Sequence, residues 1–279
     1  MRIIIMLFFF IANVCFAAAQ TCGTLTFNAV ALEAANNHYS DYQQFKGISK
    51  CLNKTLSLNY IIVTDPYYNT NVTMADINAN LKELNDAFSP ICLSFQICNI
   101  DTLYEHKYDS WNRMEEEAEF QVLFCKENVI NIILVGGLDP YASSIGIFTP
   151  SLPAKDFILL PKDYLLGKMI AHQMGHLFGL YHTYETAHGL ELVNESNCTT
   201  SGDLVCDTPA DILPAPWLWI TPFIQVCVWD GLDADTNGDK YAPIFGNMMG
   251  DGPCPLTSFT VGQYNRMIYY FEKFRGYLK

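Results

Sequence analysis

Three histidines in the segment 172–182, HQMGHLFGLYH, stand four and six residues apart, a spacing that can hold a metal ion. On a helix, residues four apart share a face, so His172 and His176 can direct their imidazoles at one ion. Gly179 tolerates the left-handed conformation that ends a helix and reverses the chain, which would bring His182 back as a third ligand. Three neutral imidazoles leave one tetrahedral position of Zn²⁺ open to water, as in catalytic zinc sites. Accidental spacing is disfavoured, because these are half of the chain's six histidines.

Hydrophobic periodicity predicts the elements that must position these histidines. The helix that carries the first two is expected from about residue 165 to residue 178. Thr73 is predicted to cap another helix, with Asp76 completing a capping box. Thr260 and Gln263 form the same pattern at the start of a helix that closes the chain. Buried or alternating apolar runs predict strands at residues 60–63, 92–98, 129–135 and 156–160.

Composition divides the chain into three segments. Residues 1–19 have the basic start, short apolar run and Ala-Ala-Ala ending of a signal peptide. Residues 20–56 show no period and are expected to be a pro-segment or an irregular lead-in. Residues 57–279 are expected to form one domain whose second half is loop-rich. Its apolar stretch 212–229 contains three prolines and is not predicted as a membrane helix. That stretch either packs over the loops or forms a partner-binding surface.

The composition also indicates a secreted protein. A formal net charge of −13 argues against a nucleic-acid partner and favours bound cations. One of the ten cysteines lies in the signal segment, and the odd remainder predicts disulfides with at least one further thiol. No stable membrane insertion is predicted, and the oligomeric state is left open. Asn-x-Ser/Thr sequons fit surface glycosylation at Asn53, Asn71, Asn194 and Asn197.

Three downstream motifs join the histidine segment in a family resemblance. They are GDLVCDTPA at 202–210, Asn-Met-Met at 247–249, and FTVGQ at 259–263 followed by Arg266-Met267. Together these segments resemble the pappalysin-like branch of the metzincin zinc metallopeptidases over roughly residues 57–272. The resemblance implies bound Zn²⁺, a Met-turn at Met249 and an α+β metzincin fold. In that fold, a twisted mixed sheet with helices forms an upper subdomain. An irregular, disulfide-stapled lower subdomain is closed by a helix.

The chain departs from the family pattern at two positions that take part in catalysis in the relatives. Gln173 stands where the family has a glutamate that accepts a proton from the zinc-bound water, and an amide cannot accept that proton. Positioned general-base catalysis of this kind is worth ~10²–10⁴-fold in rate. Asp251 follows Met249 by two residues, where relatives commonly carry an oxyanion-stabilising tyrosine, and a carboxylate would oppose that charge. Glu185 is the nearest replacement base, but it would need an unusual loop path.

The resemblance also implies calcium in the lower subdomain. Relatives bind it near the segment that matches Asp203, Asp207 and Thr208. A second cluster of hard oxygen ligands surrounds a glycine turn, as calcium loops do, although a solvated acidic turn is its alternative. This second cluster consists of Asp233, Asp235, Asn237 and Asp239.

The cysteines leave several pairings open. Four in the loop-rich half allow three pairings, of which the resemblance suggests Cys198–Cys227 and Cys206–Cys254. Cys22 lies in a Thr-Cys-Gly-Thr stretch similar to one near the start of relatives' pro-segments. It is expected either to cap the zinc as a latency switch or to form an ordinary disulfide. The partners for that disulfide are Cys51, Cys92, Cys98 and Cys125.

Three functions are compatible with these patterns. The first is a zinc-binding, catalytically impaired metzincin that binds a peptide or protein in its cleft. The second is a slow but genuine zinc endopeptidase, and the third is an interaction module in which zinc is merely structural. The departures at Gln173 and Asp251 favour the first.

Overall fold

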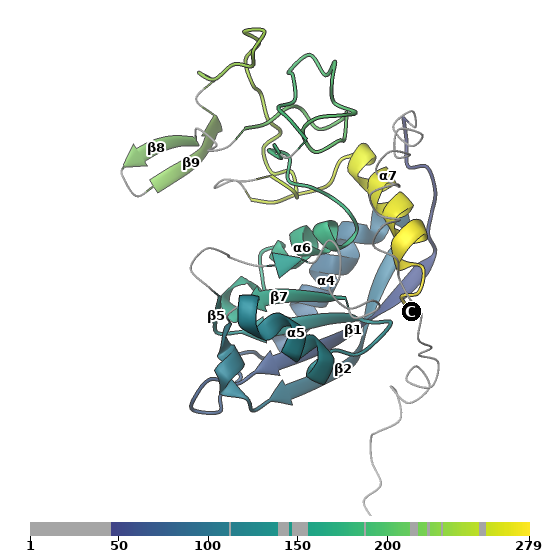
Figure 1. Ribbon diagram of the computed structural model, residues 1–279, viewed down its shortest axis with the longest axis vertical. Coiled ribbons are helices and arrows are strands. Elements are labelled where there is room, and N and C mark those ends of the chain that lie inside the picture. Colours follow the sequence, from purple (N-terminus) through teal and green to yellow (C-terminus); the bar gives the residue numbers. More distant parts are fainter. Residues whose placement is uncertain are drawn as a thin grey trace, which may run out of the picture.

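The computed structural model describes residues 46–111, 113–138, 145–146, 156–186, 188–212, 217–221, 224–229, 231–250 and 255–279. Its centre is a five-stranded sheet of order β2-β1-β4-β7-β6 (Figure 1). Strand β6 runs antiparallel to β7, and the other neighbours are parallel. The sheet is therefore mixed, as predicted. Its strands are β1 (Lys54–Val63), β2 (Leu93–Leu103), β4 (Ile130–Val135), β6 (Ile145–Gly146) and β7 (Phe157–Pro161).

Helices alternate with these strands along the chain, giving a mixed α/β fold. The α-helices are α4 (Met74–Phe88), α5 (Arg113–Phe124), α6 (Met169–Leu177) and α7 (Val261–Tyr270). Shorter helical segments are η1 (Ser89–Ile91), η2 (His106–Asp109), η3 (Lys162–Tyr164) and η4 (Phe271–Arg275). The remaining strands form two small pairs, β3 (Ser110–Trp111) with β5 (Gly137–Leu138) and β8 (Trp217–Thr221) with β9 (Ile224–Trp229).

Strand β1 shows why the sheet is covered on both faces. Its residues alternate between two buried clusters, because successive side chains of a strand point to opposite faces. Tyr60 and Ile62 pack with α4, α6 and α7 on one face. Ile61 and Val63 pack with Phe120 of α5 on the other. Near-continuous apolar strands of this kind are expected where both faces of a parallel sheet are buried.

Most of the predicted elements are confirmed, with shifted boundaries. Thr73–Asp76 and Thr260–Gln263 both form complete capping boxes, at the starts of α4 and α7. Strand β1 begins at Lys54, six residues before the predicted strand and ahead of the expected domain boundary at residue 57. Helix α6 begins at Met169 rather than near residue 165, because Gly167 and Lys168 take left-handed backbone angles.

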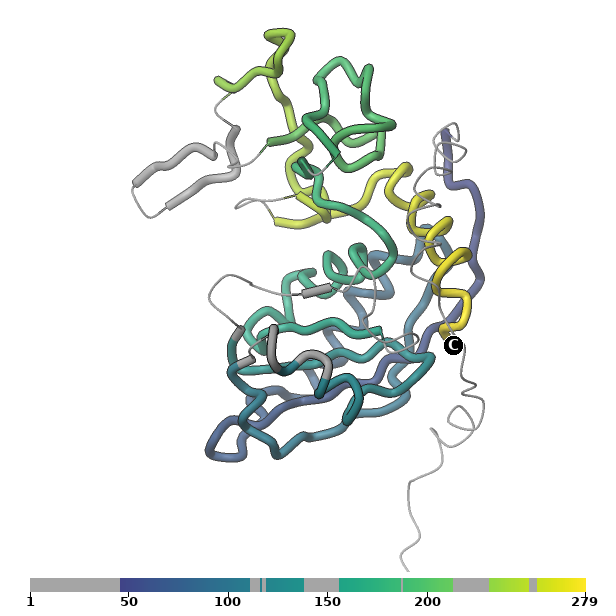
Figure 2. Tube along the Cα trace, viewed as in Figure 1, coloured from purple at the N-terminus to yellow at the C-terminus, as the bar shows by residue number. Residues whose placement is uncertain are grey.

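Beyond α6 the chain becomes loop-rich, and α7 then returns to the sheet (Figure 1). The loop-rich region lies on the far side of α6 from the sheet. Tyr264 of α7 donates a hydrogen bond from its hydroxyl to the carbonyl of Ala87 at the end of α4. The chain end then pairs beside β1, where Ser57 N donates to Lys279 O at 2.7 Å (Figure 2). A closing helix therefore ties the last residues to the first strand.

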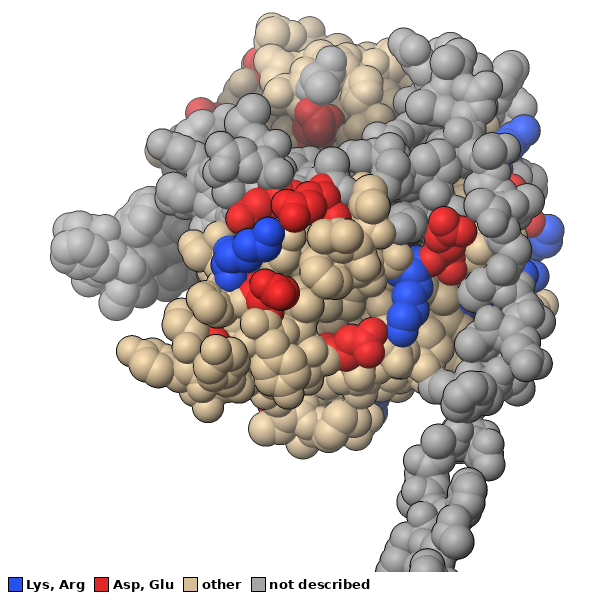
Figure 3. Space-filling model, turned by 60° about the horizontal axis from the view of Figure 1, so that its bottom comes forward, with Lys and Arg blue, Asp and Glu red and all other residues tan. Residues whose placement is uncertain are grey.

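Charged side chains of both signs are interspersed over the face shown in Figure 3. The described part of that face carries no large basic patch, in keeping with the acidic balance of the whole chain. Within the described residues, no helix is both long enough and apolar enough to cross a membrane.

Candidate metal centre

Helix α6 and the turn after it bring the three histidines together. The Nε2 atoms of His172 and His176 lie 3.1 Å apart, those of His176 and His182 lie 3.1 Å apart, and those of His182 and His172 lie 3.3 Å apart. Bonds of about 2.0–2.1 Å from a tetrahedral zinc place neighbouring nitrogens roughly 3.3 Å apart. The donor set and its spacing therefore fit Zn²⁺. Within the described residues, no second group of three His, Cys, Asp or Glu side chains converges in this way.

Backbone carbonyls orient two of the three imidazoles. His172 Nδ1 donates to Met248 O at 2.7 Å, and His176 Nδ1 donates to Leu180 O at 2.9 Å. A proton on Nδ1 leaves the Nε2 lone pair to face the metal, so these bonds select the ligating tautomer. His182 is held differently, by a parallel stack on the ring of Tyr184 with centroids 4.6 Å apart.

Burial favours the neutral imidazoles of His176 and His182. Desolvation, followed by the neighbouring histidines, lowers the pKa of His176 well below its usual value. Desolvation, followed by His172, lowers the pKa of His182 to about 4, against a smaller opposing effect of Glu185. Because a metal competes with protons for imidazole nitrogens, a lowered pKa favours ligation at neutral pH.

Gly179 makes the turn that carries His182. Its φ is +89°, and the hydrogen bonds Gly179 N→His176 O and Leu180 N→Gly175 O close the end of α6 around it. The face of Tyr270 fills the space where a side chain would stand, since an added Cβ would lie 2.3 Å from that ring. Position 179 therefore requires glycine both for its backbone angle and for its packing.

Gly179→Ala is expected to lower the free energy of unfolding by roughly 2–5 kcal/mol, combining left-handed strain of ~1–2 with overpacking of ~1–3. Gly238→Ala is the matched control, because Gly238 has φ +87° but no atom within 4 Å of an added Cβ. Urea denaturation of both variants measures the difference. Equal losses would show that the contact with Tyr270 does not matter.

The Asn-Met-Met segment lies directly against α6. An added Cβ on Gly175 would lie 2.7 Å from Met249 Sδ, so the methionine packs against the backbone of the helix. Asn247 Oδ1 accepts from Met249 N at 2.8 Å, and its amide pairs with Gln263 of α7. Asp251, the second predicted departure from the family, lies outside the described residues.

Gln173 is buried beside His172 on α6, with 4% of its surface exposed. Its Nε2 donates a weak hydrogen bond to Met169 Sδ, one turn earlier, at 3.9 Å. A neutral amide in this place can donate and accept hydrogen bonds but cannot take up a proton near neutral pH.

Two of the acidic residues predicted to bind calcium, Asp207 and Asp235, accept hydrogen bonds that organise the local backbone. Asp207 accepts from Thr260 Oγ1 at 2.6 Å and from Gly262 N at 2.7 Å, so it caps the first turn of α7. Asp235 accepts from the backbone N–H groups of Asn237 and Asp239 and thereby organises their turn. Asp233, Asn237 and Asp239 are exposed. The structure therefore gives Asp207 and Asp235 clear structural partners within the protein.

Asp203 and Thr208 do converge, and they do so in the interior. The Thr208 hydroxyl lies 3.0 and 2.9 Å from the two Asp203 oxygens and also approaches Val205 O. The hydroxyl has one proton for these three acceptors. Val205 N also donates to Asp203 Oδ1 at 2.9 Å, which still leaves more acceptors than donors. Both side chains are 1% exposed. We call Asp203, Val205 O and Thr208, together with Glu191, whose carboxylate lies against Gly202, the oxygen cluster.

Glu191 is the member of this cluster that the sequence did not reveal. It is 4% exposed, and neither carboxylate oxygen has a hydrogen-bond partner among the described residues. Desolvation, followed by repulsion from Glu195, raises its pKa to about 7, and burial also raises the pKa of Asp203. An added Cβ on Gly202 would lie 2.2 Å from Glu191 Oε2. The contact runs between two loops, and no spacing rule in the sequence could have found it.

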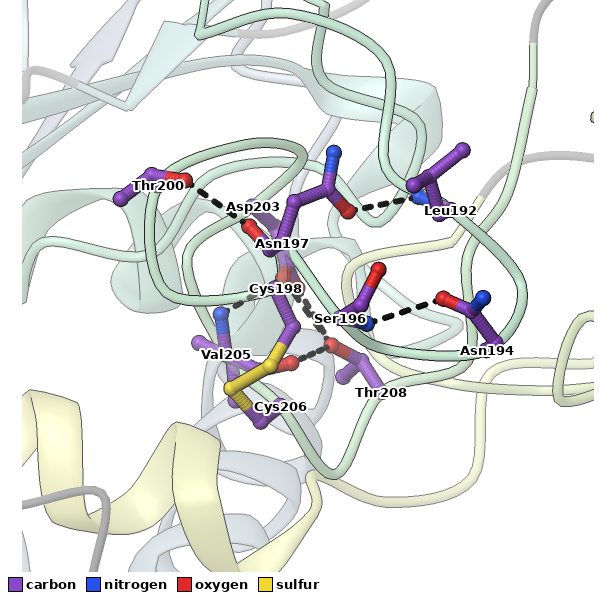
Figure 4. Close-up of a disulfide and its surroundings, with 10 residues drawn as sticks. All are labelled: Leu192, Asn194, Ser196, Asn197, Cys198, Thr200, Asp203, Val205, Cys206 and Thr208. Atoms are coloured by element: carbon purple, nitrogen blue, oxygen red, sulfur yellow. Dashed lines mark hydrogen bonds between the residues drawn. A yellow bond between two sulfur atoms is a disulfide. The ribbon is translucent and has the colours of Figure 1, made fainter. Parts of the chain in front are cut away.

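The loop that contains Asp203 is closed by a disulfide between Cys198 and Cys206 (Figure 4). The expected pairings Cys198–Cys227 and Cys206–Cys254 are therefore wrong. Thr200 N and Ser201 N both donate to Asn197 O, and this compact turn brings the two bonded Cα atoms to 5.0 Å. Cys254 and the side chain of Cys227 lie outside the described residues.

A second disulfide joins Cys51 and Cys92, at the starts of β1 and β2. Two of the four partners considered for Cys22 are thus bonded to each other, which leaves Cys98 and Cys125 from that set. Cys22 itself lies outside the described residues, so its role as a latency switch stays a prediction.

Known proteins resemble this chain in sequence. An extracellular metalloprotease of Pyricularia oryzae is 35% identical over 218 residues, covering 72% of this chain and 69% of the relative. This chain belongs to the extracellular metalloprotease family. Proteins of the same name from Colletotrichum graminicola and Sordaria macrospora are each 31% identical, over 41% and 50% of this chain. The matched regions span only 34% and 40% of those two relatives.

Family models and solved structures were also compared with this chain. No family model matches the chain. The crystal structure of metalloproteinase-II from Bacteroides fragilis aligns with a TM-score of 0.32 at 14% identity, covering 64% of this chain and 57% of that one. The extracellular relatives and the two disulfides are consistent with a secreted member of the metalloprotease family.

Proposed function

We propose that this metalloprotease-family chain is a secreted zinc-binding protein of the pappalysin-like metzincin type that holds peptide or protein segments but hydrolyses them poorly. One observation carries the proposal: three imidazoles converge as a zinc site while the adjacent buried position holds Gln173. Zn²⁺ held by these histidines would supply Lewis-acid chemistry, polarising a substrate carbonyl and acidifying a water. Gln173 can orient that water by hydrogen bonds but cannot take its proton.

A retention experiment tests this function. Immobilised zinc-loaded protein is incubated with a peptide library, and the retained peptides are identified by mass spectrometry. We expect intact peptides that are released when a chelator removes zinc, and no retention by the metal-free protein. Accumulation of cleaved products at the pace of a working protease would contradict the proposal.

A slow but genuine zinc endopeptidase is the second candidate. The observation in its favour is the family itself, because the named relatives are metalloproteases and the three histidines fit zinc. Chelator-sensitive turnover with a defined cleavage site would establish it.

We further propose that the oxygen cluster is a calcium site. Ca²⁺ takes six to eight oxygen ligands, including carboxylates and backbone carbonyls. The cluster supplies buried oxygens of these types, and the carboxylate of Glu191 lacks a partner among the described residues. The outer turn at Asp235 is the weaker candidate, because three backbone N–H groups already donate to Asp235, whereas one donates to Asp203. The other polar side chains of that turn are exposed.

Calcium is therefore expected to stabilise the fold through Glu191. At a Ca²⁺ concentration of about 100 times its dissociation constant, mass action adds about 2.7 kcal/mol to the free energy of unfolding. Glu191→Gln keeps the size of the side chain and should abolish most of this gain. Thermal melts with and without Ca²⁺ measure it, with Glu105→Gln, an exposed glutamate before η2, as the matched control. Equal stabilisation of the wild type and Glu191→Gln would place calcium elsewhere.

A further inference from the structure

Arg266 of α7 is a buried cation next to the histidine turn. Its side chain is 0% exposed, and its guanidinium lies between the rings of Tyr181 and Tyr270, 5.0 and 4.9 Å from their centroids. Its Nη2 also donates to the Tyr270 hydroxyl at 3.2 Å. Arginine stays charged when buried, so its placement has to be compensated by these rings and by nearby polar groups.

One of its hydrogen bonds reaches the turn that carries the third ligand. Arg266 Nε donates to Gly179 O at 2.7 Å, and Gly179 is the left-handed residue between α6 and His182. Tyr270, which stacks on the guanidinium, also fills the space beside Gly179. Because His182 lies beyond the end of α6, its position depends on this turn. Arg266 therefore holds the turn from a different helix.

A second set of contacts runs from the same turn to the oxygen cluster. The ring of Tyr181 makes an edge contact with His188 at 4.7 Å, and His188 Nδ1 donates to Gly202 O at 3.2 Å. Gly202 directly precedes Asp203 and packs against the carboxylate of Glu191. These contacts connect the histidine turn to the oxygen cluster.

We propose that Arg266 is a positioning residue that holds the His182 turn and couples it to the oxygen cluster, so that a divalent cation in the cluster tightens zinc binding. This inference rests on the zinc and calcium sites proposed above. A cation in the cluster would fix the loop that carries Asp203, which His188 contacts at the carbonyl of Gly202. Such coupling is reciprocal, so zinc must tighten the binding of Ca²⁺ by the same factor.

Zinc affinity measured by competition with a zinc-selective chromophoric chelator, with and without Ca²⁺, tests the proposal. In the wild type, Ca²⁺ is expected to tighten zinc binding about fivefold or more. Arg266→Lys keeps the charge but loses the geometry of the guanidinium, and it should weaken zinc binding about 10–100-fold. It should also remove most of the effect of Ca²⁺.

Arg275→Lys is the matched control. Arg275 is equally buried, at 2% exposed, and it pairs with Asp156, away from the histidines. This variant should lose stability without losing zinc affinity. The visible spectrum of the Co²⁺-loaded protein gives a second reading, since distortion of the three-histidine geometry changes it in Arg266→Lys but not in Arg275→Lys.

The possible results test the zinc site, the role of Arg266 and the coupling to Ca²⁺ separately. Failure of the wild type to bind zinc would overturn the proposed zinc site itself. Normal zinc binding by the wild type with equal affinities in the two lysine variants would overturn the role of Arg266. A wild type insensitive to Ca²⁺ would overturn the coupling. If Arg266→Lys does not fold, Tyr270→Phe is the replacement variant, because it removes one hydrogen bond of the guanidinium and keeps the ring. An unchanged zinc affinity and cobalt spectrum in Tyr270→Phe would contradict the proposal.

Discussion

Gln173→Glu is expected to raise the rate of peptide hydrolysis about 10²–10⁴-fold over the wild type at equal zinc occupancy, which is the usual contribution of a positioned general base. Gln173 is buried beside His172, where a carboxylate could accept the proton of a zinc-bound water. The measurement is kcat/KM on quenched fluorescent peptides, with zinc content determined for each sample.

Gln173→Met is the matched control, because it is similar in size and cannot accept a proton. It is expected to stay as slow as the wild type. If Gln173→Glu is also slow while zinc is bound, Asp251 becomes the limiting position, and adding Asp251→Tyr should then release the activity. A wild type as fast as the glutamate variant would contradict the assignment of Gln173.

The second large effect is the loss of zinc from His182→Ala. Changes to groups that merely orient a ligand cost about 10–100-fold in metal affinity, so removal of the ligand itself should cost more than about 100-fold. In this variant, the turn at Gly179 would bring no third imidazole nitrogen to the two on α6, and Tyr184 would have no ring to stack on. Equilibrium dialysis against a zinc buffer measures the affinity.

His106→Ala is the control for this experiment, because His106 is exposed in η2 and outside the three-histidine group. It should bind zinc as the wild type does. Circular dichroism must show that both variants are folded. Unaltered zinc binding by His182→Ala would mean that the third ligand comes from elsewhere.

Local signals in the sequence predicted the parts of the site that depend on neighbouring residues. The spacing of His172 and His176 follows from the helical repeat, and Gly179 marks the turn that returns His182. The two capping boxes are equally local, since each links residues three positions apart. The folded structure keeps the local conformations that these short segments favour on their own.

Features that depend on distant residues could not be predicted in this way. Helix α6 starts late because Glu83 of α4 accepts from the N–H groups of Gly167 and Lys168. Asp207 caps α7 across more than fifty residues of sequence, a contact that no local pattern predicts. Glu191 carries no local signal at all, because its environment is made by the loop that contains Gly202.

The disulfides show the limit of a family resemblance. Similarity suggested pairings for Cys198 and Cys206 with partners far along the chain, whereas the turn at Asn197 brings these two together. Four cysteines allow three pairings, and sequence alone cannot choose among them.

The central claim is that this member of the metalloprotease family holds zinc without efficient hydrolysis. The most direct test is to measure zinc content by elemental analysis and chelator-sensitive peptide turnover on the same sample of secreted wild-type protein. We predict one zinc per chain, with turnover at least about 10²-fold below that of Gln173→Glu. Turnover close to that of the glutamate variant, abolished by the chelator, would contradict this account.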